Sequence, residues 1–278
     1  MKILLSCHYF KNYTGSEIYF YELASALQSR GCSVNIFSII DGNPLRGKIK
    51  NIKFVNKYSL FMKKYDLVLF SHGVFTWKYL KKVSSRIFVN IIHSEVIDAE
   101  IPIVNSKIDY YVGIRPSIID FIKSNNDIKV PVKLIYNPFD FSRFNPENCY
   151  KDNEKDKVLL FPGSIDYLRI NPLKYLLRLS KTEKFNILHV GRNDYSITHP
   201  SLTSHDPVWE IEEYYRQCDI VSGIFLGRTS IEGLLCNKKV LQFDVTKEGS
   251  INKVYWLNDD NLMKFDRLHV ADQFINLL

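Results

Sequence analysis

Short apolar runs alternate with amphipathic segments along most of the chain, a pattern typical of parallel strands joined by helices. Between the first two runs, Phe20, Leu23, Ala24 and Leu27 repeat at helical spacing, as on a half-buried helix. A second amphipathic helix is predicted over 209–218, after Pro207. Strands are predicted over 2–7, 33–40, 50–55, 66–70, 86–92, 109–113, 132–136, 158–162, 185–190, 219–224 and 239–243. The pattern predicts an α/β protein.

A polar, charge-rich segment over 147–157 interrupts this alternation and has the composition of a linker. We therefore expect two Rossmann-like domains facing a central cleft, over 1–146 and 158–278, with the last helix a candidate to pack back on the first domain. A chain of 278 residues is long enough for each domain to bury its own core.

Composition narrows the setting of the protein. The chain has no apolar run of about 18 residues, and its apolar N-terminal run is too short for a signal peptide. Five cysteines lie far apart without a CxxC pair, which favours free thiols and a cytoplasmic location. The net charge of +7 comes from lysines spread along the chain rather than clustered with aromatic residues, so nucleic acid ranks last as a partner. A solvated surface and peripheral contact with anionic lipid headgroups at the inner face of a membrane both remain open.

The stretch from 219 to 244 reads as strand, loop, helix and strand. Gly227 breaks the chain, and Thr229 and Glu232 have the spacing of a capping box at the start of the helix. A strand that opens onto a helix N-terminus presents unpaired N–H groups and the positive end of the helix dipole to an anion. Arg228 lies at this helix N-terminus, so the segment predicts a phosphate site. Glu232 is either a ligand of the bound molecule or only a helix cap.

Two glycine-containing segments exclude other nucleotide sites. Gly15 precedes the first helix, but GxG occurs nowhere in the chain, so a nicotinamide enzyme is not expected. The segment 42–48 nearly spells a phosphate-binding P-loop, but Ile49 stands where a hydroxyl is needed. We interpret that segment as a surface turn.

Further candidates lie at the carboxyl ends of predicted strands, where parallel sheets carry their ligands. His93 follows one strand and His72 another, while Arg169 and Arg192 lie in the loops after two strands of the second domain. An arginine here suits phosphate through its bidentate fork, although a solvated role is equally open. Neither an Asp-x-Asp motif nor a His/Cys metal spacing is present, so no metal site is predicted.

Five segments, in order, resemble glycosyltransferases of the GT-B fold of the family-4 type. GRTSIEGLLCNKKVLQFD is similar to their donor-site segment, the loop at Gly15 to their Gly-Gly-Ala-Glu loop, and 136–146 to their crossover between domains. His93 matches a family histidine, and 163–169 is similar to the Gly-Arg-x-x-x-x-Lys loop. The chain departs from the family at Ile224, where a glutamate is usual, and at Ser164, where an arginine is usual.

The resemblance implies roles for individual residues. Glu232 would hold the ribose of a nucleotide sugar, and His93 would lie near the transferred sugar and the acceptor hydroxyl. The backbone at Gly15 would approach the donor phosphate or the acceptor. Arg169 would bind the pyrophosphate, with the second charge from Arg228 or Arg192.

The resemblance also implies an activity. It indicates metal-independent transfer of a hexose, with retention, from a UDP- or GDP-linked donor to a glycan or lipid-linked acceptor in polysaccharide or glycoconjugate assembly. No other cofactor is expected. Two alternatives stay open: a non-catalytic relative that scaffolds a glycan-assembly complex, and a sugar-nucleotide hydrolase or epimerase.

Overall fold

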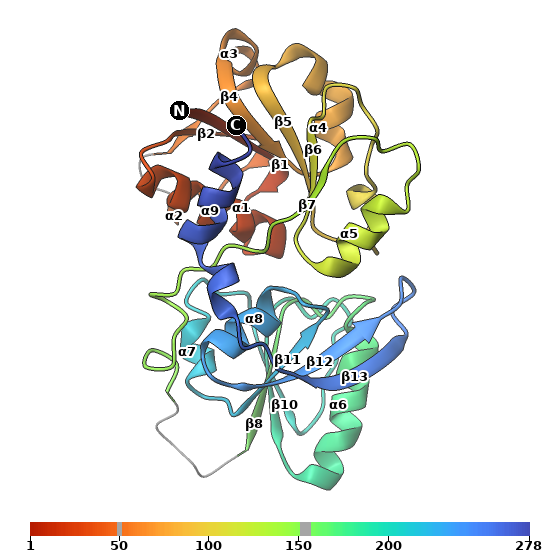
Figure 1. The fold of residues 1–278 in the computed structure, drawn as a ribbon. Coiled ribbons are helices and arrows are strands. Elements are labelled where there is room, and N and C mark those ends of the chain that lie inside the picture. Colours follow the sequence, from red (N-terminus) through yellow and green to blue (C-terminus); the bar gives the residue numbers. More distant parts are fainter. Residues whose placement is uncertain (49–51, 151–156) are drawn as a thin grey trace. The chain divides into compact units, whose positions relative to one another are not determined.

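The computed structural model describes residues 1–48, 52–150 and 157–278. They form two compact units, one made of residues 1–139 with 263–278 and the other of residues 140–262 (Figure 1). The predicted linker, 147–157, falls within the range of the second unit. Its residues 151–156 lie outside the described residues.

The first unit is built on a parallel sheet with the strand order β3-β2-β1-β4-β5-β6-β7. Its strands are β1 Lys2–Phe10, β2 Ser33–Asp41, β3 Lys53–Phe54, β4 Lys64–Phe70, β5 Ser84–Ile92, β6 Tyr110–Gly113 and β7 Val132–Leu134. In the register, Leu5 of β1 lies between Ile36 of β2 and Leu69 of β4. Strands are added on both sides of β1, so the sheet is doubly wound with a switch point between β1 and β4.

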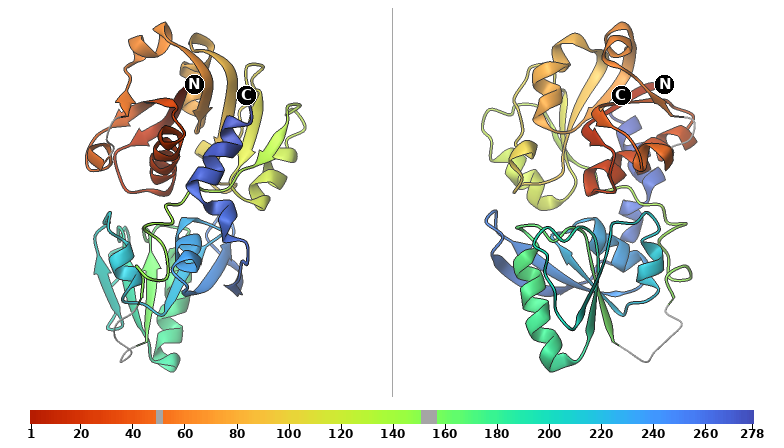
Figure 2. Two further views of the ribbon diagram at one scale, coloured as in Figure 1. Left: turned by 60° about the vertical axis from the view of Figure 1, so that its left-hand side comes forward. Right: turned by 180° about the vertical axis from the view of Figure 1, so that it is seen from behind.

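Helices surround this sheet, and the last of them comes from the end of the chain. They are α1 Gly15–Ser29, α2 Leu45–Lys48, α3 Lys57–Met62, α4 Gly73–Lys78, α5 Pro116–Lys123 and α9 Arg267–Ile275, with short 3-10 turns η1 Leu80–Lys82, η2 Asp98–Glu100 and η3 Leu262–Phe265. Helix α9 lies beside α1 (Figures 1 and 2). Ion pairs join Arg30 to Asp272 at 2.6 Å and Arg267 to Glu22 at 3.1 Å. The chain end is thereby held on the first unit.

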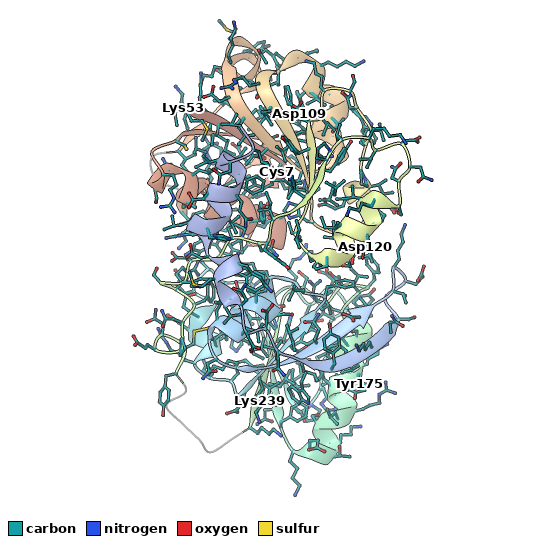
Figure 3. All side chains as sticks on the ribbon, in the orientation of Figure 1. Cys7, Lys53, Asp109, Asp120, Tyr175 and Lys239 are labelled. Atoms are coloured by element: carbon teal, nitrogen blue, oxygen red, sulfur yellow. A yellow bond between two sulfur atoms is a disulfide. The ribbon has the colours of Figure 1, made fainter. Side chains whose placement is uncertain are left out.

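The second unit repeats the doubly wound plan with the strand order β10-β9-β8-β11-β12-β13. Its elements are β8 Val158–Pro162, α6 Ile170–Glu183, β9 Asn186–Val190, β10 Leu202–His205, α7 Glu212–Tyr215, β11 Ile220–Ile224, α8 Arg228–Leu235, β12 Lys239–Val245 and β13 Ile251–Leu257. Only β13 runs antiparallel to its neighbour. In Figure 3, Tyr175 of α6 marks the contact of that helix with the sheet, where its ring lies 5.7 Å from the ring of Phe243. Among the helices of the described residues, none is long and apolar enough to cross a membrane.

Three local expectations need correction. The helix expected over 209–218 is reduced to Glu212–Tyr215, because the carbonyl of Trp209 accepts a hydrogen bond from Arg143 at 2.8 Å instead of continuing a helix. The strand expected over 50–55 is limited to Lys53–Phe54, and residues 50 and 51 lie outside the described residues. The P-loop-like segment contains one helical turn, Leu45–Lys48.

The cysteines also differ from expectation. Cys149 and Cys236 form a disulfide that links the start of the second unit to the residue after α8, while Cys7, Cys32 and Cys218 are free and buried. The expectation of five free thiols is therefore wrong for this pair. The two cysteines are 87 residues apart and belong to no motif, so only the fold brings them together.

Candidate functional site

The carboxyl ends of three neighbouring strands form the candidate site of the second unit. Strands β9, β8 and β11 lie side by side and end at Val190, Pro162 and Ile224. The loops that follow carry the predicted phosphate ligands. Such an edge is where doubly wound sheets bind nucleotides.

Asp166 organises the loop after β8. Its Oδ1 accepts hydrogen bonds from the backbone N–H groups of Leu168 and Arg169, both at 3.1 Å, and its Oδ2 binds the Arg169 guanidinium at 2.7 Å. Arg169 lies close enough to Gly163 that a Cβ there would be 3.2 Å from its Nε. The guanidinium is therefore held over the glycine of the loop.

Arg192, from the loop after β9, lies beside Ser164. Its Nε is 3.4 Å from the Ser164 hydroxyl, and its backbone carbonyl accepts the Ile165 N–H at 2.7 Å. The side chain is 67% exposed, with Asp194 3.5 Å away. The fold thus places Arg192, one of the two candidates for the second charge, beside Ser164.

Gly191 allows these two loops to approach each other. A Cβ on Gly191 would lie 2.3 Å from the carbonyl oxygen of Gly163, an overlap with backbone that no side-chain movement relieves. The pair Gly163 and Gly191 therefore fixes the spacing between the loops that carry Arg169 and Arg192.

His189, which the sequence analysis missed, supports the same loop from below. It is completely buried in β9, with Nε2 2.9 Å from the carbonyl of Gly163 and Nδ1 3.3 Å from the Ser204 hydroxyl. Burial lowers the pKa of His189, although the bond to Gly163 opposes the shift. A neutral ring then donates from Nε2 to the loop carbonyl. The sequence feature that could have identified His189 is its position as a histidine inside an otherwise apolar strand.

The helix after β11 begins one residue earlier than predicted. Gly227 is the N-cap of α8 and Arg228 its first residue, with no side-chain capping bond. The predicted capping box between Thr229 and Glu232 is therefore wrong, because Thr229 is already inside the first turn. Its carbonyl accepts a bond from the Tyr215 hydroxyl at 3.3 Å.

Glu232 lies in a buried network. Its Oε1 is 2.7 Å from Nε of Arg228 and its Oε2 accepts the Tyr215 hydroxyl at 2.9 Å. Burial raises the pKa of Glu232, and Arg228 opposes that shift. Arg228 also lies over the ring of Phe144, 5.8 Å from its centroid. Arg228 thus forms an ion pair with Glu232, and its phosphate role stays a prediction. Because a carboxylate accepts several hydrogen bonds, the ribose role of Glu232 stays a prediction.

In the first unit, Glu17 shapes the loop before α1. It is 2% exposed, and its Oε1 accepts the N–H groups of Lys11 and Asn12 at 2.8 and 3.1 Å. The hydroxyl of Thr14, the N-cap residue, donates to its Oε2 at 2.5 Å. A Cβ on Gly15 would meet nothing within 4 Å. The loop is thus rigidly held, with open space at the glycine where a ligand was expected to approach.

Glu100 joins the two predicted histidines. His72 follows β4 and places Nε2 3.1 Å from Oε1 of Glu100, while the backbone N–H of His93 donates to Oε2 at 3.1 Å. Burial alone would raise the pKa of Glu100, but the hydrogen bond from His72 and the neighbouring histidines lower it. Glu100 was missed because it lies seven residues beyond His93, outside any recognised motif.

His93 is the least satisfied polar group of this cluster. Its Nε2 is buried and has no hydrogen-bond partner among the described residues, and its ring lies edge-on to Tyr19 at 4.7 Å. Burial lowers the pKa of His93 to about 4, so the ring is neutral at pH 7. Arg115 donates to the His93 carbonyl at 3.3 Å and pairs with Glu95. A buried polar atom without a partner calls for an explanation, and the predicted contact of His93 with a ligand would supply one; that role stays a prediction.

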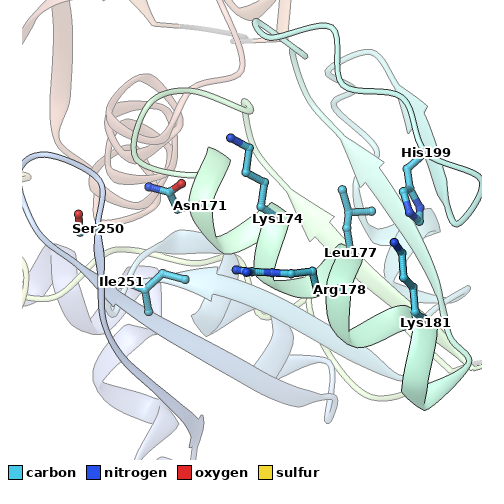
Figure 4. A pocket seen from close by; sticks show the side chains of 8 residues that line it. All are labelled: Asn171, Lys174, Leu177, Arg178, Lys181, His199, Ser250 and Ile251. Carbon is cyan, nitrogen blue, oxygen red and sulfur yellow. The ribbon is translucent and has the colours of Figure 1, made fainter.

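A cavity of about 510 Å³ lies along α6 in the second unit (Figure 4). Its lining includes Lys174, Arg178 and Lys181 of α6, with His199 near Lys181. None of the predicted site residues lines this cavity. Within the described residues, no group of three His, Cys, Asp or Glu side chains could hold a metal ion.

Two doubly wound units in one chain give the GT-B fold of glycosyltransferases, so the predicted fold class is confirmed. HepE from Anabaena, solved with UDP-glucose, is similar with a TM-score of 0.71 and 14% identity, over 100% of this chain and 99% of that one. Sucrose-phosphate synthase from Thermosynechococcus elongatus is similar with a TM-score of 0.68 and 13% identity, over 100% and 98%. A glycosyltransferase from Rickettsia africae reaches 0.61 and 16% identity, over 99% and 93%. No protein-family model and no curated protein matches the chain.

Proposed function

We propose that the protein transfers a sugar from a nucleotide-sugar donor to an acceptor hydroxyl. The observation that carries this proposal is the arrangement of Arg169 and Arg192 on the two loops around Gly163. Two guanidinium groups at the carboxyl edge of a doubly wound sheet suit a diphosphate through charge and bidentate hydrogen bonding. HepE, whose fold is similar, was solved with UDP-glucose, which favours a UDP-linked hexose as the first donor to try.

The electrostatics suit a departing diphosphate. As the bond from sugar to phosphate breaks, negative charge grows on the leaving oxygens, and fixed cations and N–H groups stabilise it without rearrangement. We propose that Arg169, Arg192 and the N-terminus of α8 supply this stabilisation without a catalytic metal. Transfer with retention is also proposed: the acceptor oxygen bonds to the anomeric carbon on the face from which the diphosphate departs, and a phosphate oxygen of the leaving group takes the acceptor proton.

His93 is proposed to contact the transferred sugar or the acceptor hydroxyl. Its Nε2 lacks a partner among the described residues, and its lowered pKa keeps the ring neutral. A neutral imidazole makes a hydrogen bond to a hydroxyl without placing a positive charge beside a developing oxocarbenium ion.

The acceptor is proposed to be a glycan or a lipid-linked glycan in surface polysaccharide or glycoconjugate assembly, with the enzyme in the cytoplasm and at the inner membrane face. The alternative of a non-catalytic relative is motivated by Ile224 and Ser164. The position of Arg192 beside Ser164 weighs against it, because a cation is still supplied there.

Nucleotide release tests the proposal. The protein is incubated with UDP- and GDP-linked hexoses, with and without a glycan acceptor and with EDTA, and the free nucleoside diphosphate is measured. Acceptor-dependent release that survives EDTA is expected. Donor binding without release would leave the non-catalytic alternative, and release that ignores the acceptor would indicate a hydrolase.

A further inference from the structure

The amino ends of the strands in the first unit gather an unusual number of cations. Strand β4 begins at Lys64, β5 follows η1, and the loop at 105–109 leads into β6, so these segments meet at one end of the sheet. Helix α3 lies over the same end (Figure 1). We call this surface the basic end; its cations are Lys2, Lys53, Lys57, Lys63, Lys64, Lys81, Lys82, Arg86 and Lys107.

Acidic groups do not balance these charges. In residues 52–70, 80–90 and 105–110, which supply all of these cations except Lys2, the acidic side chains are Asp66 and Asp109. They accept backbone N–H groups, from Lys2 at 2.7 Å and from Phe88 at 2.8 Å. Asp109 and Lys53 mark the end in Figure 3. Both carboxylates therefore serve the sheet, and the net charge of the surface stays strongly positive.

Apolar side chains protrude among the cations. Met62, the last residue of α3, is 88% exposed, and Tyr58 on the same helix is 67% exposed. Lys57 lies 5.0 Å from the ring of Tyr58, and Lys82 of η1 lies 5.6 Å from the ring of Phe61. Lys57 and Tyr58 are neighbours in the sequence, whereas the fold brings Lys82 to the ring of Phe61.

A hollow of about 510 Å³ lies next to these residues. It lies between η1, the start of β5 and the loop before β6, and its charged lining is Lys81, Lys82, Arg86 and Lys107 with one carboxylate, Asp109. Lys107 ties that loop to η1 by donating to the carbonyl of Lys81 at 3.1 Å. A hollow with four cations on its wall suits a phosphate headgroup.

We propose that the basic end docks on a membrane surface rich in anionic phospholipids. Lysine stems lie along apolar surface while their ammonium groups reach phosphates, and Met62 and Tyr58 enter the boundary between headgroups and acyl chains. Each lysine near an anionic surface strengthens binding about fivefold, equivalent to about 1 kcal/mol. A nucleic acid would use the cations but would leave the protruding Met62 in water.

Sedimentation with vesicles tests this docking independently of the proposed transferase activity. The protein is spun with vesicles of equal parts phosphatidylglycerol and phosphatidylcholine, and with phosphatidylcholine alone, at low salt. Replacing Lys64 and Lys81 together by glutamine should weaken binding to the anionic vesicles about 30-fold. The matched control replaces Lys174 and Lys181 on α6, which removes the same charge and should leave most binding intact.

The apolar contribution needs its own pair of variants. Met62→Ser should weaken vesicle binding several-fold, whereas Met263→Ser, which changes an equally flexible residue that is 63% exposed on η3, should not. Circular dichroism of each variant checks folding. Equal losses in the two lysine pairs, or no preference for anionic vesicles, would overturn the proposal. Binding to a DNA duplex that Lys64 and Lys81 support, without vesicle binding, would make nucleic acid the partner instead.

Discussion

The Nε atom of Arg192 lies 3.4 Å from the hydroxyl of Ser164, although 28 residues separate them in the chain. The resemblance predicts an arginine at the position of Ser164, and the fold brings the cation of Arg192 to that position from the next loop. Arg169 occupies the other side of Gly163. The predicted diphosphate site can therefore be tested by removing the positive charge at position 192 and restoring one at position 164.

Arg192→Ala should weaken a nucleoside diphosphate by about 1.5–3 kcal/mol, the usual value for a lost hydrogen bond to a charged group, and should leave the nucleoside almost unaffected. Adding Ser164→Arg to that variant should restore part of the affinity. Calorimetric titration with both ligands measures each effect, with Arg178→Ala on α6 as the control. Equal weakening of nucleoside and diphosphate would show that Arg192 does not touch the phosphates.

Glu232 and Thr229 should differ sharply in their effects on stability. Glu232→Gln removes the charge facing Arg228, whose side chain is only 13% exposed, and should lower the free energy of unfolding by about 3 kcal/mol. Thr229→Ala should cost less than about 0.5 kcal/mol, because Thr229 makes no capping bond. Urea unfolding measures both. An unchanged midpoint for Glu232→Gln would mean that the ion pair contributes nothing in solution.

The ribose role of Glu232 is tested on the same variant by binding. If the carboxylate holds a ribose, Glu232→Gln weakens the nucleoside and the nucleoside diphosphate alike, by about 1.5–3 kcal/mol. This pattern differs from that of Arg192→Ala. Unaltered binding of the nucleoside would restrict Glu232 to its internal contacts with Arg228 and Tyr215.

His93 should make folding stability depend on pH. Because its folded pKa is about 4 and its ordinary value is 6.5, the unfolded chain takes up a proton below pH 6.5 that the folded state refuses. Stability is therefore retained above pH 6.5 and lost as the pH falls toward about 4, by roughly 3 kcal/mol. Glu100, His72 and Arg115 are the charged and titratable groups that act on the His93 ring. To isolate the contribution of His93, the parent is compared with His93→Gln, in which stability should depend less steeply on pH. Melting temperatures at several pH values measure it, and an equal slope in the parent and in His93→Gln would contradict the prediction.

Two glycines should respond oppositely to alanine. Gly191→Ala places a Cβ 2.3 Å from the backbone of Gly163, so the loops must separate, with loss of stability and of diphosphate affinity. Gly15→Ala meets no atom within 4 Å and should leave stability unchanged or slightly improved. If a ligand approaches the backbone at Gly15, the same variant should nevertheless lose activity. Thermal melting and nucleotide release measure the two effects, and an unaltered rate for Gly15→Ala would remove this residue from the site.

Local sequence patterns determined most of the elements around the site. The run from 219 to 244 predicted strand, helix and strand, and β11, α8 and β12 lie there, because apolar runs and a glycine break act within a few residues. The helix start was misplaced by one residue, since Gly227 and Thr229 both resemble caps and only the backbone decides between them. The short α7 departs from its pattern because Arg143, 66 residues away, bonds to Trp209.

Tertiary structure alone decided which candidate side chains meet. The order of the strands places the loops after β8 and β9 together, and so Arg192 reaches Ser164. The same cause joins Glu100 to His72 and gathers lysines from α3, η1 and the loop before β6 at one end of a sheet. Periodicity records which face of an element is buried, but not which strand becomes its neighbour. The choice of neighbouring strand depends on how the whole sheet packs. The sequence therefore determined the helices and strands and the polar side chains at the strand ends, while the fold determined which of those side chains contact each other.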